Sequence, residues 1–177
     1  VEQYLYTGGH VILFPNIESE SSAFAYINNI TSNVTVKYTN LIKQSLSGNS
    51  FQEINPESVQ INDIEDLFGD VNHKDRNIRM FEYISLPFHP EFSKIQLNDG
   101  SPIWNRHTIR SGILDVFGFA VNLNWANFPI KRTFLPFTHF LLYSHTSNKK
   151  NLYKHTGDTW NHILSEYYSQ TIYHIQP

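Results

Sequence analysis

Residues 117–125 have the sequence Phe-Gly-Phe-Ala-Val-Asn-Leu-Asn-Trp, in which large apolar side chains at the odd positions alternate with small or polar ones. Successive side chains of a β-strand point to opposite faces, so a period of two indicates a strand with one buried face. We therefore expect a strand over these residues. Its aromatic face would lie in a core, and its face of Gly, Ala and Asn would stay open.

The same reasoning predicts other strands. Gly8 and Gly9 separate two β-prone runs, which is a hairpin signal because glycine adopts positive φ at little cost. Val34, Val36 and Tyr38 again alternate with polar residues. The predicted strands, of which the last two would form a hairpin, cover residues 4–6, 11–14, 23–30, 34–38, 79–86, 134–143 and 152–155.

Two segments have a helical period instead. Residues 55–69 place apolar side chains about every 3.6 positions behind Asn55, a capping residue, with Pro56 in the first turn. In the tail, an apolar stripe at helical spacing follows Asp158 and predicts about three turns of amphipathic helix. The stripe consists of Trp160, Ile163, Leu164, Tyr167 and Tyr168. The predicted fold class is therefore α+β, an antiparallel sheet packed around one or two helices that include this C-terminal helix.

Length and composition limit the possible classes of protein. A chain of 177 residues suits a single domain over residues 1–177 with one core. Only 16% of the residues are charged and the net charge is −3, which disfavours nucleic acid and anionic membranes as partners. The apolar runs are too short to span a bilayer and no signal-peptide pattern opens the chain, so we expect a soluble protein with no membrane insertion. The absence of cysteine excludes disulfides, Cys zinc sites and thiol catalysis.

One short cluster combines an aromatic plate with polar side chains. Trp104 precedes three residues whose amide, guanidinium and imidazole groups can bond to hydroxyls, namely Asn105, Arg106 and His107. A sugar ring stacks its apolar face on an aromatic ring and offers its hydroxyls to such groups. The predicted carbohydrate-binding residues are Trp104, Asn105, Arg106, His107, Asn122, Asn124 and Trp160. Trp104 is expected to be exposed, whereas Trp125 is more typical of a core residue.

Two other functions remain open. His107, His145 and His155 each precede a Thr and superficially resemble the paired His-x-Thr elements of two-histidine phosphoesterases. They indicate a His-dependent phosphodiesterase or toxin nuclease as the alternative, although their spacing argues against it. A structural or immunity-type binding protein is a third hypothesis, and it predicts a flat apolar patch. No metal-ligand spacing and no nucleotide-binding or serine-hydrolase motif is present, so we expect no cofactor and no metal.

The tail also carries a family resemblance. Residues 153–161 place a Tyr strand before Gly157-Asp158-Thr159, and residues 167–173 begin with Tyr-Tyr-Ser-Gln-Thr. This pattern resembles the distal, glycan-binding head of the rotavirus outer-capsid spike protein. Residues 1–15 and 33–35 are similar to the opening strands of that head, so the resemblance covers about a third of the chain.

The resemblance implies a non-enzymatic, lectin-like viral attachment domain. Its partners would be a host cell-surface oligosaccharide containing galactose or N-acetyllactosamine and the remainder of the spike protein. Its location would be the outer capsid surface of a virion, after synthesis in the host cytoplasm. The family's heads are all-β galectin-like sandwiches, which makes that fold the alternative, but the helical period of the tail departs from it. No sugar-contacting residue of the family falls on a position that can be aligned.

Overall fold

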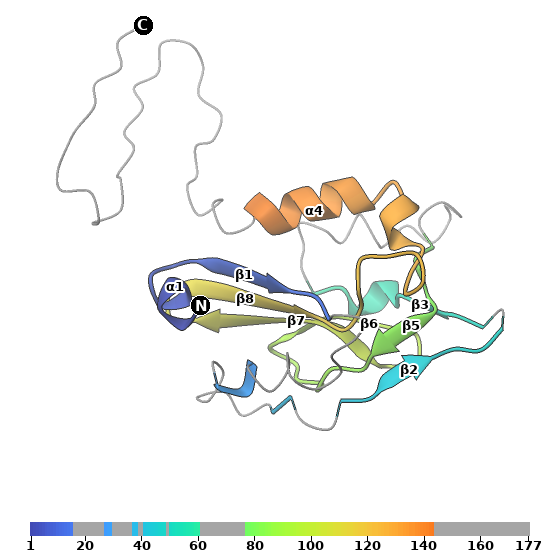
Figure 1. Cartoon of the computed structure of the whole chain (residues 1–177), viewed down its shortest axis with the longest axis horizontal. Helices are drawn as coiled ribbons and strands as arrows, with labels where there is room; N and C mark the ends of the chain where they lie inside the picture. The colour runs from blue at the N-terminus through green and yellow to red at the C-terminus, as the bar shows by residue number, and fades with distance from the viewer. Residues whose placement is uncertain (16–26, 30–36, 39–40, 49, 61–76, 144–177) are drawn as a thin grey trace, which may run out of the picture. The chain divides into compact units, whose positions relative to one another are not determined.

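The computed structural model describes residues 1–15, 27–29, 37–38, 41–48, 50–60 and 77–143 (Figure 1). The chain divides into two compact units, Val1–His145 and Thr146–Pro177, and all the described residues belong to the first. The predicted tail helix, Trp160 and the predicted strand 152–155 lie outside the described residues, as does most of the predicted strands 23–30 and 34–38. Residues 27–29, the described part of the strand predicted over 23–30, are helical, so that prediction is wrong there. The prediction of a single domain over residues 1–177 concerns both units and is not tested by the described residues.

The fold is α+β, as predicted, because strands of several short sheets combine with few helices. The helical elements are α1 (Glu2–Tyr6), η1 (Pro56–Ser58), η3 (Phe128–Ile130) and α4 (Phe134–Tyr143). The strands are β1 (His10–Leu13), β2 (Lys43–Ser45), β3 (Gln52–Glu53), β4 (Arg79–Met80), β5 (Glu82–Ile84), β6 (Ser93–Gln96), β7 (Pro102–Ile109) and β8 (Gly112–Phe117).

The main sheet has the strand order β1-β8-β7-β6. Strands β7 and β8 form a hairpin whose turn contains Arg110 at a φ of 53°, and β6 adds to β7 in antiparallel fashion. Strand β1 pairs with β8 in parallel, so the N-terminal segment joins the sheet beside its longest hairpin. Two small antiparallel sheets, β2–β5 and β3–β4, complete the described strands.

An aromatic core lies between this sheet and α4. Trp104 of β7 and Phe117 of β8 are register partners, and their rings stack with centroids 5.3 Å apart. Phe137 of α4 meets the two rings edge-on, at 5.4 Å and 5.9 Å. Figure 1 shows α4 lying over the sheet, and the ring contacts place it on the face that carries Trp104 and Phe117. Offset and edge-to-face aromatic pairs of this kind add to the stabilisation from burial alone.

The strand predicted over residues 117–125 is wrong beyond Phe117, where β8 ends. Gly118 lies against the main chain of Ile84, where a side chain would collide, and its carbonyl accepts from the amide of Ile84 at 2.6 Å. The Asn122 side chain then accepts from the amides of Asn124 and Trp125, at 3.0 Å and 3.1 Å. Asparagine closes such turns with its own side chain, so the chain turns where alternation predicted a strand. Trp125 is buried, as expected.

Two other predictions fail for local reasons. Residues 134–143 form helix α4 and not a strand. Pro136 lies in the first turn of α4, where proline is tolerated, and the apolar side chains fall on several sides of the helix. Gly8 and Gly9 follow helix α1 instead of closing a hairpin, and the amide of Gly9 bonds to Tyr4 O. The all-β sandwich is therefore wrong. The strand predicted over 79–86 is found as two short strands, β4 and β5, which belong to different small sheets. Of the helix predicted over 55–69, only η1 is helical among the described residues: Asn55 caps it, Val59 is already extended, and residues 61–69 lie outside the described residues.

Candidate functional site

Strand β7 carries the four adjacent residues that the sequence predicted to bind sugar. Because side chains alternate along a strand, Trp104 and Arg106 point to the face that α4 covers, and Asn105 and His107 point to the opposite face. The cluster is therefore split between two separate polar networks, one on each side of the sheet.

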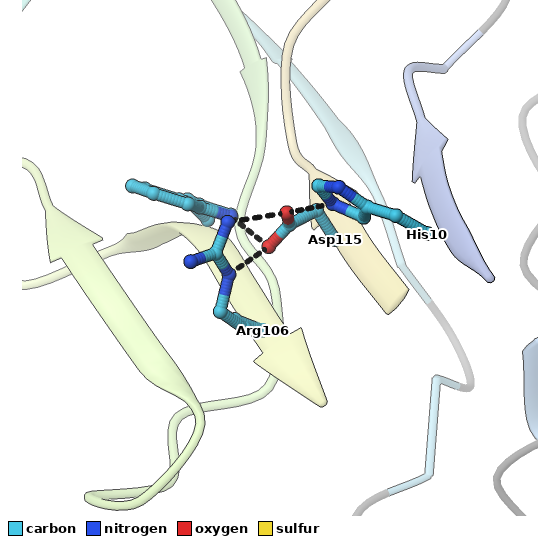
Figure 2. Close-up of polar contacts among 4 residues, drawn as sticks. His10, Arg106 and Asp115 are labelled. Carbon is cyan, nitrogen blue, oxygen red and sulfur yellow. Dashed lines mark hydrogen bonds and ion pairs between the residues drawn. The ribbon is translucent and has the colours of Figure 1, made fainter. Parts of the chain in front are cut away.

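Asp115 of β8 is the centre of the first network (Figure 2). Its Oδ1 accepts from the Trp104 indole N–H and from Arg106 Nε, both at 2.8 Å. Its Oδ2 accepts from Arg106 Nη2 at 2.7 Å and lies 2.7 Å from His10 Nε2. Arg106 reaches the carboxylate from the register-paired position on β7, and His10 reaches it from β1.

The environment keeps Asp115 ionised. Burial of the carboxyl group raises its pKa, but the hydrogen bonds from Arg106, His10 and Trp104 and the charge of Arg106 outweigh this, so the net pKa lies below its ordinary value. Both carboxylate oxygens are already bonded within the protein. The network therefore holds β1, β7 and β8 together, and it presents no open group for a substrate.

Tyr38 joins Asn105 and His107 in the second network. The Tyr38 hydroxyl lies 2.6 Å from His107 Nε2 and accepts from Asn105 Nδ2 at 3.1 Å. Burial lowers the pKa of His107 to about 4 and raises that of Tyr38. Phe92 covers the imidazole, with ring centroids 4.7 Å apart. His107 is therefore a neutral, buried ring at physiological pH.

The structure places most of the predicted carbohydrate-binding residues of β7 inside the protein. Trp104, Asn105 and His107 have 0% exposure, and Arg106 is mostly buried in its ion pair. The expected exposure of Trp104 is wrong, because α4 and Phe117 enclose its ring. A sugar ring has no access to a side chain in this position. The phosphodiesterase alternative also loses its first histidine, since His107 is inaccessible and His145 and His155 lie outside the described residues.

The remaining predicted residues lie elsewhere. Asn122 is half-buried and closes the turn after β8, and Asn124 is exposed in the same turn. All the hydrogen bonds of Asn122 are local to residues 120–126, so the structure does not bring it together with Asn105 or Arg106. Trp160 lies outside the described residues.

One surface feature has no counterpart among the predictions from the sequence. A pocket of about 290 Å³ lies beside α4, and we call it the α4 pocket. Its walls are the apolar side of α4, the end of β1, and the segment around η3. It is lined by Ile12, Phe14, Val121, Phe128, Phe134, Phe137, Thr138, Leu141 and Leu142. Among the described residues of the lining, Thr138 is the one polar side chain, and its hydroxyl donates to Phe134 O at 2.8 Å.

Exposed apolar side chains surround the pocket. Leu142 of its lining is 60% exposed, and outside the lining Leu135 of α4 and Ile130 of η3 are 75% and 72% exposed. Lys131 and Arg132 lie in the turn that joins η3 to α4, between the pocket residues Phe128 and Phe134. Residues 134–143 are apolar at nearly every position, so the helix has an apolar outer side as well as an apolar core side. The same composition predicted a strand, and for that reason the pocket was not expected.

The described residues contain no group of three or more His, Cys, Asp or Glu side chains placed to bind a metal ion. Within the same ranges, no helix has the length and apolar character that crossing a membrane requires.

Comparisons with known proteins give one structural match. No family model and no curated protein sequence matches the chain. The chain is similar to a solved structure described as the cytoplasmic protein STM1381 from Salmonella typhimurium LT2, at 17% identity and a TM-score of 0.49. The match covers 81% of this chain, which spans 56% of the length of that protein. At this level of similarity the match carries no argument about activity.

One prediction is corrected by this comparison. The matched protein is named as cytoplasmic and not as a component of a virion, which contradicts the predicted location on an outer capsid.

Proposed function

We propose that this chain is a binding protein that holds an amphipathic helix of a partner protein in the α4 pocket. The observation that carries the proposal is the joint presence of an apolar hollow and exposed apolar side chains on the same helix. Large apolar patches on a protein surface commonly mark interaction sites. This proposal develops the third hypothesis from the sequence, a binding protein with an apolar patch.

The size of the pocket suits side chains rather than a whole segment. A volume of about 290 Å³ equals roughly ten water-sized volumes of about 30 Å³. Each leucine side chain has four carbon groups, so a space of this size is sufficient for about two leucine side chains. Along α4 the lining runs from Phe134 to Leu142, which corresponds to roughly 12 Å of helix. Two anchors one or two turns apart on a partner helix match that length.

The polarity of the lining favours a helical partner over an extended one. Buried backbone N–H and C=O groups need hydrogen-bond partners, and an apolar wall supplies none. The hydroxyl of Thr138, the one polar side chain of the lining, already donates to its own helix. A helix satisfies its own backbone groups, so it can place apolar side chains in the α4 pocket without losing hydrogen bonds.

A display selection tests the proposal. A library of helical peptides is selected against the full chain, and enriched peptides are synthesised and their Kd values measured. We expect at least tenfold weaker binding to Thr138→Trp, which fills the pocket, and to Leu142→Glu, which places a charge at its mouth. Ile42→Glu is the matched control, because Ile42 is 70% exposed and precedes β2. No enriched peptide, or equal binding to all the variants, would contradict the proposal.

Glycan binding stays a prediction that no finding tests. The described residues lend it little support, since Trp104, Asn105 and His107 are enclosed and Arg106 is committed to Asp115. Asn124 is the one predicted residue that is exposed among those described.

A further inference from the structure

We propose that the partner helix is acidic, and that its carboxylates meet Lys131 and Arg132 while its apolar side chains enter the α4 pocket. This inference rests on the proposed function. It adds the chemistry of the partner, which the apolar lining alone does not specify.

The first support is the position of the two cations. Lys131 and Arg132 lie between η3 and α4, and the backbone around them is fixed by the bonds from Lys131 N to Phe128 O at 2.9 Å and from Phe134 N to Lys131 O at 3.0 Å. Phe128 and Phe134 both line the α4 pocket. The two cationic side chains therefore arise from the same turn that forms one end of the pocket.

The second support is that these charges are unbalanced. Among the described residues, neither Lys131 nor Arg132 forms an ion pair, and residues 116–143 contain no Asp or Glu. Two other basic side chains do have carboxylate partners, since Lys43 pairs with Glu82 at 3.0 Å and Arg106 pairs with Asp115. Within the described part of the chain, the turn before α4 is thus a local positive site beside the apolar pocket.

Complementary charge at the edge of an apolar contact favours one partner over others and speeds association. Carboxylates on the partner would lie at the rim, where water still reaches both charges, so neither has to be fully buried. A partner helix with basic residues in the same positions would meet like charges. The geometry thus favours an acidic helix in one orientation, with its carboxylates at the α4 N-terminal end of the pocket.

An anionic membrane is the competing macromolecular partner. Stable electrostatic attachment to a membrane commonly uses clusters of four to eight basic residues. The turn supplies two, and the neighbouring surface includes the neutral polar residues Asn122, Asn124 and Thr138. The α4 pocket, moreover, is of a size that suits individual side chains. We therefore argue for a peptide partner, and vesicle binding is an outcome of the test.

The experiment uses fluorescence anisotropy with the full chain and three labelled helical peptides. All three share two leucine anchors one turn apart. The first carries Glu at the flanking positions, the second carries Lys there, and the third has the first peptide's composition in scrambled order. We expect the acidic peptide to bind at least tenfold more tightly than the basic one, with an advantage that shrinks as ionic strength rises.

A charge exchange identifies the residues responsible. In the double variant Lys131→Glu and Arg132→Glu, we expect the preference to reverse, so that the basic peptide binds more tightly. The matched control Lys37→Glu with Arg110→Glu changes the net charge equally at exposed positions outside this turn and should keep the acidic preference. Thr138→Trp should weaken both peptides.

The outcomes separate the two proposals. If acidic and basic peptides bind equally and Thr138→Trp weakens both, the inference about charge fails and the proposed function stands. If no peptide binds more tightly than the scrambled one, both fail. Binding of the chain to vesicles of mixed neutral and anionic phospholipid that is lost in Leu142→Glu would overturn the peptide proposal in favour of a membrane surface.

Discussion

Arg106 and Asp115 lie opposite each other on the β7–β8 hairpin, and the guanidinium donates through two nitrogens to the two oxygens of a carboxylate that is inaccessible to solvent. This pairing explains why the residues predicted to bind sugar are buried. Arg106 has a structural role as the ion-pair partner of Asp115, and the nearby Trp104 donates a hydrogen bond to the same carboxylate. The open surface of the described unit lies instead beside α4.

Asp115→Asn should lower the free energy of unfolding by about 3–5 kcal/mol, because the change leaves the buried guanidinium of Arg106 without its counter-charge. Urea denaturation at neutral pH measures the loss. The control is Glu82→Gln, which breaks the partly exposed pair with Lys43 and should cost about 1 kcal/mol or less. The pKa of Asp115 is held below its ordinary value. The ionised carboxylate therefore adds to the free energy of unfolding at neutral pH, and this stabilisation is lost only as the pH falls through the lowered pKa. Equal losses in the two variants would contradict the account of this network.

His107 should make the protein less stable in mild acid. Its pKa is about 4 in the folded state and 6.5 ordinarily, so between these values the unfolded chain binds a proton that the folded chain does not. The free energy of unfolding should therefore fall by about 3 kcal/mol as the pH drops from 7 to 4. Above pH 6.5 the ring is neutral in both states and contributes no pH dependence.

Urea titrations at a series of pH values measure this slope. Comparison with His107→Gln isolates the contribution of the one ring from that of other titrating groups. A slope that is the same in the variant would show that His107 is not buried in the neutral form.

Gly118→Ala should lower the free energy of unfolding by about 3 kcal/mol, because the new methyl group would collide with the carbonyl oxygen of Ile84. Gly48→Ala is a control in open space, where the positive φ of 68° costs about 1–2 kcal/mol by itself. Chemical denaturation of both variants tests whether the chain passes as closely to Ile84 as described. A Gly118→Ala protein as stable as the natural one would show that it does not.

The fold could be predicted in class but not in detail from the sequence. The extended segment within 79–86 and the cap at Asn55 depend on local signals, and both are found, as β4 with β5 and as the start of η1. The helix predicted behind the cap already ends at Ser58. The period of two over residues 117–125 was outweighed by contacts that are distant in sequence, since Gly118 bonds to Ile84 and Ile103. Residues 134–143 are apolar on several sides, so their periodicity did not distinguish a helix from a buried strand.

Less of the candidate site than of the fold could be predicted from the sequence. Residue types identified Trp104 to His107 as chemically rich, but the sequence does not show that Asp115 and Tyr38 lie within hydrogen-bond distance of them. An aspartate within the apolar run of residues 112–117 was the available sign of a buried, paired charge, since charged residues are seldom fully buried without a partner. The α4 pocket joins segments far apart in the chain, Ile12 and Leu142 among them, and so had no local signature.

The outer side of α4 should tolerate polar substitution. Leu135→Glu and Leu142→Glu should each change the free energy of unfolding by about 0.5 kcal/mol or less, because both side chains are mainly exposed. Leu141→Ala, at a buried position on the same helix, should cost about 2–5 kcal/mol. Thermal or urea unfolding compares the three. A large loss in Leu142→Glu would mean that this side chain is already packed within the protein, which would leave no surface for a partner.

The most direct test of the account is an NMR titration of the full chain, labelled at its methyl groups and amides, with the acidic helical peptide. The account predicts saturable shift changes at the lining of the α4 pocket, including the methyl groups of Ile12, Val121 and Leu142, together with the amides of Lys131 and Arg132. Resonances of the β2–β5 sheet should stay unchanged. No shift at these positions, or shifts confined to other surfaces, would contradict the assignment of the α4 pocket as the binding site.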